Sequence, residues 1–318
     1  MKYKNWDNFK VHVTGIGRIM SRPKGCNDLT QKDKRKQITI ISKEEKSSED
    51  LEQLEFFKQK RERFLHPPLS ELAKGYLIER YSAEKYNIRR ASAGGRQKPT
   101  ITKGVALENE GIDIISFVDK IKYQQPSCPT ENEYMIGECD ILCYDNKKIV
   151  EVKTSWNAAN FMLNLRKNKL TFHQWSQIQG YLELYNLEFG QVCHVLVNTP
   201  PHLIDQEKIN LFRRYTFGEI SRDRYDQEIE KYDSLFDYSK IPIKKRIIRF
   251  DVQRCPEFIE GVDVKVVKCR EWLNGFERTF LSNKNILTLP EDYIHAATTG
   301  DENSPEHNPD EPHSLDQE

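Results

Sequence analysis

The sequence predicts an α/β fold in which a central mixed β-sheet is flanked by helices. Two runs of β-forming residues, 136–144 and 149–154, enclose a polar turn and have the pattern of a β-hairpin. A third run, 191–198, is continuously apolar, as expected of a strand inside a sheet that is covered on both faces. Helical periodicity before and after these runs indicates that helices provide the cover.

The composition is that of a globular protein with a mildly basic body. The 318 residues are 37% hydrophobic, with a mean hydropathy of −0.75, and can bury a substantial core. Seven of the 49 acidic residues and none of the 49 basic ones lie at 301–318, so the rest carries a net charge of +7. That surplus suits a polyanionic partner such as DNA, although many unrelated proteins share it.

The cysteines and the hydropathy indicate the compartment. No two of the seven cysteines form a Cys-x-x-Cys pair, which argues against a structural zinc or an iron–sulfur cluster. An odd number of cysteines, some of them in apolar strands, fits reduced thiols in a cytoplasmic protein. Neither a signal peptide nor a membrane-spanning run is expected.

The first 26 residues are predicted to begin the main domain, with a strand at 9–13 and a helix capped by Thr14. A helix N-terminus with nearby glycines and Arg18 can bind a phosphate, although a simple capped turn is the commoner meaning. Residues 27–66 are dense in charge and form a predicted insertion, partly helical from about 49 to 64. The main domain then extends over 67–295 and begins with a helix at 69–87.

A helix predicted at 102–120 carries a carboxylate on its apolar side. Glu108 shares that side with Ile112 and Ile115 at helical spacing. A charge in that position needs a partner, which the hairpin could supply. A glutamate on the helix surface is the alternative interpretation.

The hairpin places acidic and basic side chains together. Alternation puts Glu151 and Lys153 on one face of the second strand, and Glu138 and Asp140 on one face of the first. If these faces coincide, two carboxylates and a lysine converge. A divalent cation such as Mg²⁺ would relieve their repulsion and activate a water for attack on a phosphodiester. A lone Glu-x-Lys pattern is weak evidence, because the charged run at 44–46 also has it.

Beyond the hairpin, a polar and basic loop is predicted at 157–171 and a helix at 172–186. Gln177 and Tyr181 lie one turn apart on a stripe beside the apolar face of this helix. His194, in the apolar strand, is predicted to be a satisfied core histidine. The chain is completed by peripheral helices at 199–239, a strand at 245–252, a helix at 256–276 and a disordered acidic tail at 296–318.

Asp140 followed by Glu151-Val152-Lys153 resembles the Asp…(Asp/Glu)-x-Lys core of the PD-(D/E)xK nucleases, with Cys139 in place of the namesake proline. The more particular similarity is to phage-type exonucleases of the lambda exonuclease and YqaJ kind. It implies a PD-(D/E)xK core that binds Mg²⁺ or Mn²⁺ through Asp140, Glu151 and the carbonyl of Val152. Lys153 would then activate water or stabilise the transition state.

The same resemblance implies roles for residues outside the hairpin. Glu108 matches a Gly-x-x-x-Glu helix whose glutamate supports the metal site. Gln177 and Tyr181 match a Gln-x-x-x-Tyr helix that orders the catalytic residues. Three residues are candidates for contact with DNA phosphates: Thr14 and Arg18, which lie where these exonucleases have a phosphate-binding turn, and Ser155.

The resemblance extends from about Val11 to about Phe276 and predicts a function. We expect a metal-dependent deoxyribonuclease, an exonuclease of phage recombination type that acts on linear duplex DNA. An endonuclease built on the same core is one alternative, and a non-catalytic module that binds DNA ends is another. A single-strand annealing protein as partner is implied by the resemblance alone, and a homo-oligomer is left open.

Overall fold

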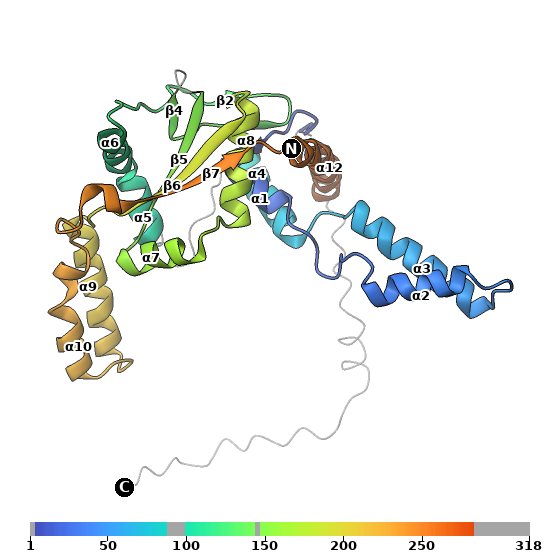
Figure 1. The fold of residues 1–318 in the computed structure, drawn as a ribbon, viewed down its shortest axis with the longest axis horizontal. Coiled ribbons are helices and arrows are strands. Elements are labelled where there is room, and N and C mark those ends of the chain that lie inside the picture. The colour runs from blue at the N-terminus through green and yellow to red at the C-terminus, as the bar shows by residue number, and fades with distance from the viewer. Residues whose placement is uncertain (1–3, 88–98, 144–146, 283–318) are drawn as a thin grey trace, which may run out of the picture. The chain divides into compact units, whose positions relative to one another are not determined.

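The computed structural model describes residues 4–87, 99–143 and 147–282, and its main feature is a four-stranded sheet (Figure 1). The strand order is β4 (Ile141–Cys143), β5 (Lys148–Thr154), β6 (Phe189–Val195) and β7 (Ile247–Gln253). β5 and β6 are parallel, whereas β4 and β7 run antiparallel to their neighbours. The predicted α/β fold with a mixed sheet is confirmed, as are the strands predicted at 191–198 and 245–252.

A second sheet has three short strands, in the order β1 (Val11–His12), β3 (Met135–Gly137) and β2 (Thr130–Glu131). The prediction of one strand at 136–144 is therefore wrong, because β3 and β4 belong to different sheets and 138–140 connect them. The chain leaves the second sheet after Gly137, the last residue of β3. A β-carbon at this position would lie 2.7 Å from the Val13 side chain, and glycine avoids this clash because it has none. The run is β-forming throughout, and pairing with different neighbours divides it.

Two helices pack on opposite faces of the four-stranded sheet (Figure 1). α6 (Glu108–Asp119) packs on one face of β5, where Ile115 and Val152 belong to one buried apolar cluster. α8 (Phe172–Leu184) packs on the other face, and its Ile178 is fully buried. Since side chains alternate along a strand, the neighbours of Val152 point to the α8 side.

The helix predicted at 102–120 is in fact two helices. α5 (Pro99–Ala106) and α6 meet at Leu107, whose φ of −115° and ψ of 13° are not helical. The break places Glu108 in the first turn of α6 instead of in mid-helix. A carboxylate is favoured there by the partial positive charge of a helix N-terminus.

The prediction of a loop at 157–171 is also wrong, since α7 (Ala158–Lys167) occupies most of this segment. Asn157 caps the helix by accepting the backbone N–H of Asn160, and Asn168 ends it with a φ of 45°. Of the residues of α7, Phe161 is the buried one. The apolar periodicity is therefore too weak to mark this helix in the sequence.

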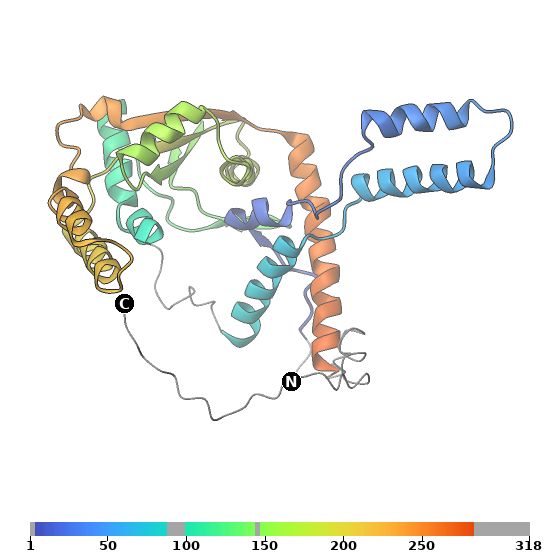
Figure 2. The same cartoon turned by 90° about the horizontal axis from the view of Figure 1, so that it is seen from below.

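The other predicted helices are found close to their expected places. α4 (Glu71–Tyr86), α8 and α12 (Pro256–Leu281) confirm the predictions at 69–87, 172–186 and 256–276. The charged segment 27–66 forms two helices where one was predicted. These are α2 (Gln31–Ile41) and α3 (Ser48–Leu65), which lie side by side (Figure 2). The remaining helices are η1 (Val13–Gly15), α1 (Ile16–Ile19), α9 (Pro201–Thr216), α10 (Arg222–Ile229), α11 (Tyr232–Leu235) and η2 (Ile243–Arg246).

Residues 4–275 form one compact unit. A second unit combines 1–3 with 276–318, of which the structure describes 276–282. The predicted acidic tail from 296 lies outside the described residues. All seven cysteines are free, and no helix in the described ranges is both long and apolar enough to cross a membrane.

Candidate active site

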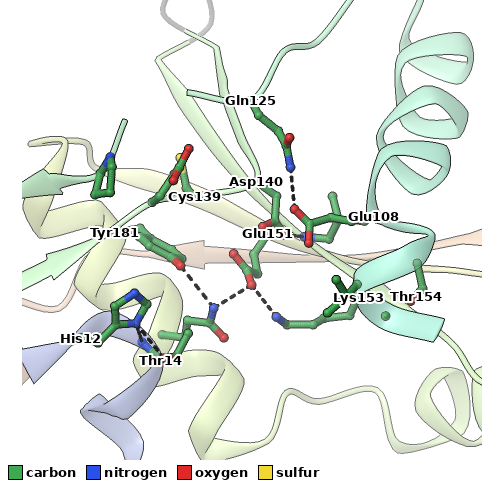
Figure 3. Close-up of a pocket in the computed structure, with 16 residues that line it drawn as sticks. His12, Thr14, Glu108, Gln125, Cys139, Asp140, Glu151, Lys153, Thr154 and Tyr181 are labelled. Atoms are coloured by element: carbon green, nitrogen blue, oxygen red, sulfur yellow. Dashed lines mark hydrogen bonds and ion pairs between the residues drawn. The ribbon is translucent and has the colours of Figure 1, made fainter. Parts of the chain in front are cut away.

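Most of the residues predicted to be functional line one pocket of about 730 Å³ (Figure 3). Its walls come from β5, the connection between β3 and β4, the helices α5, α6 and α8, the segment of β1 and η1, and the irregular segment that follows α6. The predicted residues found there are Thr14, Glu108, Asp140, Glu151, Val152, Lys153, Gln177 and Tyr181. Segments that are far apart in the sequence therefore meet at one place on the sheet.

Asp140 is held beside the middle of β5. Its Oδ2 accepts a hydrogen bond from the backbone N–H of Val152 at 2.6 Å. Asp140 precedes β4 and lies outside any strand, so this hydrogen bond, and not strand alternation, directs its carboxyl group. The carboxyl group is thereby placed beside the residue that separates Glu151 from Lys153.

Glu151 is a buried carboxylate with one satisfied oxygen and one unsatisfied oxygen. Its side chain is 2% exposed, and Oε1 accepts a hydrogen bond from Nε2 of Gln177 at 2.7 Å. The ammonium of Lys153 forms an ion pair with the same carboxylate. Oε2 is buried and has no hydrogen-bond partner within the described part of the chain. A buried carboxylate oxygen without a donor is costly, which suits a site that receives a positively charged group.

The ionisable groups of the pocket carry an excess of negative charge. Burial first, and then the nearby Glu151, raise the pKa of Asp140 and the pKa of Glu108. Burial alone would lower the pKa of Lys153, but Glu151 and Asp140 together raise it. The lysine therefore keeps its charge, while the acids repel one another.

Glu108 reaches the pocket from the first turn of α6. Its Oε1 accepts a hydrogen bond from Nε2 of Gln125 at 2.5 Å. Gln125 follows α6 in an irregular segment and also lines the pocket. No periodicity or motif marks Gln125, so sequence reasoning does not find it.

No family model and no curated protein matches this chain. Among solved structures, it is similar to a phage-related exonuclease from Haemophilus somnus 129PT, with a TM-score of 0.56 and 20% sequence identity, covering 86% of this chain and 97% of that one. At this level of sequence identity, the similarity shows that the two proteins share a fold. An alkaline exonuclease from Laribacter hongkongensis also matches, with a TM-score of 0.49 and 9% identity, covering 87% of this chain and 95% of that one.

The resemblance of the sequence to PD-(D/E)xK nucleases implies a bound divalent cation, and the pocket residues fit one. Mg²⁺ binds through one or two carboxylates and retains several waters. Asp140, Glu151 and the Val152 carbonyl offer such oxygen donors, and Oε2 of Glu151 has no competing partner among the described residues. The described residues hold no group of three or more His, Cys, Asp or Glu side chains placed as a ready ion site. Waters would therefore complete the coordination.

Gln177 and Tyr181 stand one helical turn apart on the side of α8 that faces Glu151. Nε2 of Gln177 lies 3.4 Å from the Tyr181 hydroxyl as well as bonding Glu151. Both side chains are buried, and burial raises the pKa of Tyr181, so the phenol stays protonated. These contacts hold Glu151 in one orientation.

Thr14 lines the pocket beside His12, a residue that no sequence pattern marks. Oγ1 of Thr14 lies 2.7 Å from Nδ1 of His12. The prediction that Thr14 caps a helix is wrong, because His12 is the capping residue: its Nδ1 accepts the backbone N–H of Thr14 at 3.3 Å. Burial lowers the pKa of His12, so a neutral imidazole and a hydroxyl face the pocket together.

Two predicted phosphate-binding residues do not line the pocket. Arg18 donates from Nη1 and Nη2 to the carboxylate of Glu79 at 2.7 and 3.1 Å, and its guanidinium lies over the ring of Tyr76. Ser155 is 5% exposed, whereas Thr154 lines the pocket. Sequence position alone does not reveal that Arg18 has a carboxylate partner 61 residues away.

Proposed function

We propose that this chain is a metal-dependent deoxyribonuclease that hydrolyses phosphodiester bonds from the ends of linear DNA. The observation that carries the proposal is the convergence of Asp140, Glu151 and Lys153 in one pocket. The fold supports the nuclease class, and the solved structure that shares it is described as a phage-related exonuclease.

Lys153 supplies positive charge where the reacting phosphate would lie. Its ammonium pairs with Glu151 in the pocket, and its raised pKa keeps it protonated at neutral pH. A fixed ammonium stabilises negative charge that develops on the phosphate in the transition state, because it needs no reorganisation during the reaction.

The remaining pocket residues orient the reacting groups. Mg²⁺ or Mn²⁺, held by Asp140, Glu151 and the Val152 carbonyl with Glu108 in support, would lower the pKa of a bound water and offset phosphate charge. Gln177 keeps the Glu151 carboxylate fixed through its hydrogen bond of 2.7 Å. Hydrogen bonds from this chain to phosphate oxygens would position the DNA without reading its sequence.

Thr14 is the predicted phosphate contact that lies in the pocket. Its hydroxyl and the His12 ring form a pair of polar groups there, which fits contact with the DNA backbone. A partner annealing protein and a homo-oligomeric state stay predictions from the resemblance.

A panel of DNA substrates tests the proposal. Linear duplexes with 5′-phosphate or 5′-hydroxyl ends, closed circular duplex and single-stranded DNA are incubated with Mg²⁺ or with EDTA. We expect linear DNA to be degraded with Mg²⁺ while closed circles stay intact. Cutting of closed circles would favour the endonuclease alternative, and binding of ends without turnover would favour the non-catalytic one.

A further inference from the structure

A buried lysine lies next to the pocket without lining it. Lys103 of α5 is 1% exposed. Its ammonium donates hydrogen bonds to the backbone carbonyls of Trp156 and Val197, both at 2.9 Å. Nζ also lies 5.8 Å from the ring centroid of Trp156 and 5.7 Å from that of Tyr238. A charge so far from water is retained only where such partners replace its hydration.

The two carbonyls lie just beyond the ends of two parallel strands, of which β5 lines the pocket. Trp156 comes two residues after the end of β5, and Val197 comes two residues after the end of β6. The last residues of these strands, Thr154 and Val195, are paired in the sheet. The side chain of Lys103 therefore connects α5 to the ends of both strands through hydrogen bonds.

α5, which Lys103 holds against the strand ends, is separated only by Leu107 from Glu108, the first residue of α6. The backbone N–H of Leu107 donates to the carbonyl of Lys103 at 3.0 Å, and Gly104 lines the pocket. Beyond Glu108, Gly111 forms the second anchor: a β-carbon there would lie 2.9 Å from the Val152 side chain. Glu108 is thus held between one anchor on the strand ends and another on β5.

We propose that Lys103 is a positioning residue that aims Glu108 into the pocket. The proposal rests on the proposed function, in which Glu108 supports the cation held by Asp140 and Glu151. Loss of the ammonium removes the donors of two carbonyls and lets α5 move away from the strand ends. The Glu108 carboxylate then loses its place beside the other acids.

The test compares Lys103→Met with a matched control, Lys265→Met. Lys265 is also buried, at 7% exposed, and its ammonium lies 3.3 and 3.4 Å from the carbonyls of Pro67 and Pro68, away from the pocket. Mn²⁺ binding to each protein is measured by electron paramagnetic resonance, and kcat and KM are measured on linear DNA. Thermal unfolding shows that each variant is folded.

We expect Lys103→Met to weaken Mn²⁺ binding and lower kcat by about 10- to 100-fold, as is usual when a residue that orients a metal ligand is removed, with KM for DNA unchanged. Lys265→Met should match the wild type in Mn²⁺ binding and in kcat. In a Glu108→Gln background, Lys103→Met should add less than about twofold, because the two act through one group. Equal Mn²⁺ binding in the two lysine variants would overturn the proposal, and so would full additivity with Glu108→Gln.

If Lys103→Met does not fold, Gly111→Ala is the second variant that tests the proposal. Its new β-carbon displaces α6 from Val152 at the second anchor, and we expect the same loss of Mn²⁺ binding. Wild-type Mn²⁺ binding in Gly111→Ala would contradict the inference. If the wild-type protein binds Mn²⁺ but degrades no DNA, the proposed function fails while the binding comparison still decides the role of Lys103.

Discussion

Nε2 of Gln177 donates a hydrogen bond to Oε1 of Glu151 at 2.7 Å, which joins the middle of α8 to the middle of β5. The other oxygen of Glu151 has no partner among the described residues. The helix thus fixes the carboxylate by one oxygen and leaves the second oxygen available. This relationship explains why a buried position of α8, beside its apolar face, holds a glutamine.

Replacement of Gln177 by alanine should therefore reduce activity more than stability. We expect kcat on linear DNA to fall by about 10- to 100-fold, as for other residues that orient metal ligands. Gln179→Ala is the matched control on the same helix, since Gln179 bonds the backbone of Gln253 and Cys255 at 2.8 Å each. That variant should lose about 1–3 kcal/mol of unfolding free energy and keep its kcat. Equal kcat in both variants would count against the role of Gln177.

Divalent cations should stabilise the folded protein through the pocket acids. At a Mg²⁺ concentration of about 100 times Kd, linkage gives a gain of about 2.7 kcal/mol in unfolding free energy. Asp140→Asn should lose most of this gain, because it replaces a carboxylate ligand of the cation with a neutral amide. The amide oxygen can still accept the hydrogen bond from the Val152 N–H. Thermal unfolding with Mg²⁺ or with EDTA at matched ionic strength measures the gain. An undiminished gain in Asp140→Asn would place the cation elsewhere.

His194 should make stability depend on pH. Burial first, and then the charge of Lys153, lower the pKa of His194 to about 4 from 6.5, and the ring is contacted by the amides of Asn164 and Gln174. The prediction of a satisfied core histidine is confirmed. The unfolded chain binds this proton more readily, so the stability from the neutral ring is complete above pH 6.5 and is lost as the pH falls towards 4.

The expected loss is up to about 3 kcal/mol, since one pKa unit corresponds to about 1.4 kcal/mol. Denaturant unfolding at pH 7 and pH 4.5 measures it in the wild type and in His194→Gln. The variant should lose less stability over this interval than the wild type. His66→Gln is the control, because that side chain is 68% exposed. An identical pH dependence in His194→Gln would contradict the account.

Thr14 and Arg18 should give different results on DNA binding. Thr14→Val removes a hydroxyl in the pocket, and we expect KM for linear DNA to rise about 2- to 10-fold, the effect of one hydrogen bond. Arg18→Met should leave KM within about twofold and lower unfolding free energy by about 1 kcal/mol, through loss of the Glu79 pair. A rise in KM for 5′-phosphorylated ends in Arg18→Met would restore the phosphate role that the resemblance assigns to it.

Strand alternation is enough to predict how β5 contributes to the site. Glu151 and Lys153 are two residues apart in a continuous β-forming run, and they pair on one face of the sheet. One-turn spacing on a helix likewise predicts that Gln177 and Tyr181 act together. These local periodicities do not depend on distant parts of the chain.

Contacts made by tertiary packing could not be predicted. The run 136–144 is β-forming throughout, and only its two different partner strands reveal the crossing at Gly137. The break at Leu107 has no proline or glycine to mark it. His12 and Gln125 carry no motif, and the carboxylate that pairs with Arg18 comes from another helix.

The most direct test of the central claim is the rate of Mg²⁺-dependent hydrolysis of linear duplex DNA by Lys153→Met, relative to Lys148→Met. Both lysines lie on β5, but Lys148 bonds Gln191 at 3.1 Å and does not line the pocket. We predict a loss of at least about 10²-fold in kcat for Lys153→Met and a rate close to that of the wild type for Lys148→Met. Folded variants with equal rates would contradict the assignment of Asp140, Glu151 and Lys153 as one catalytic centre.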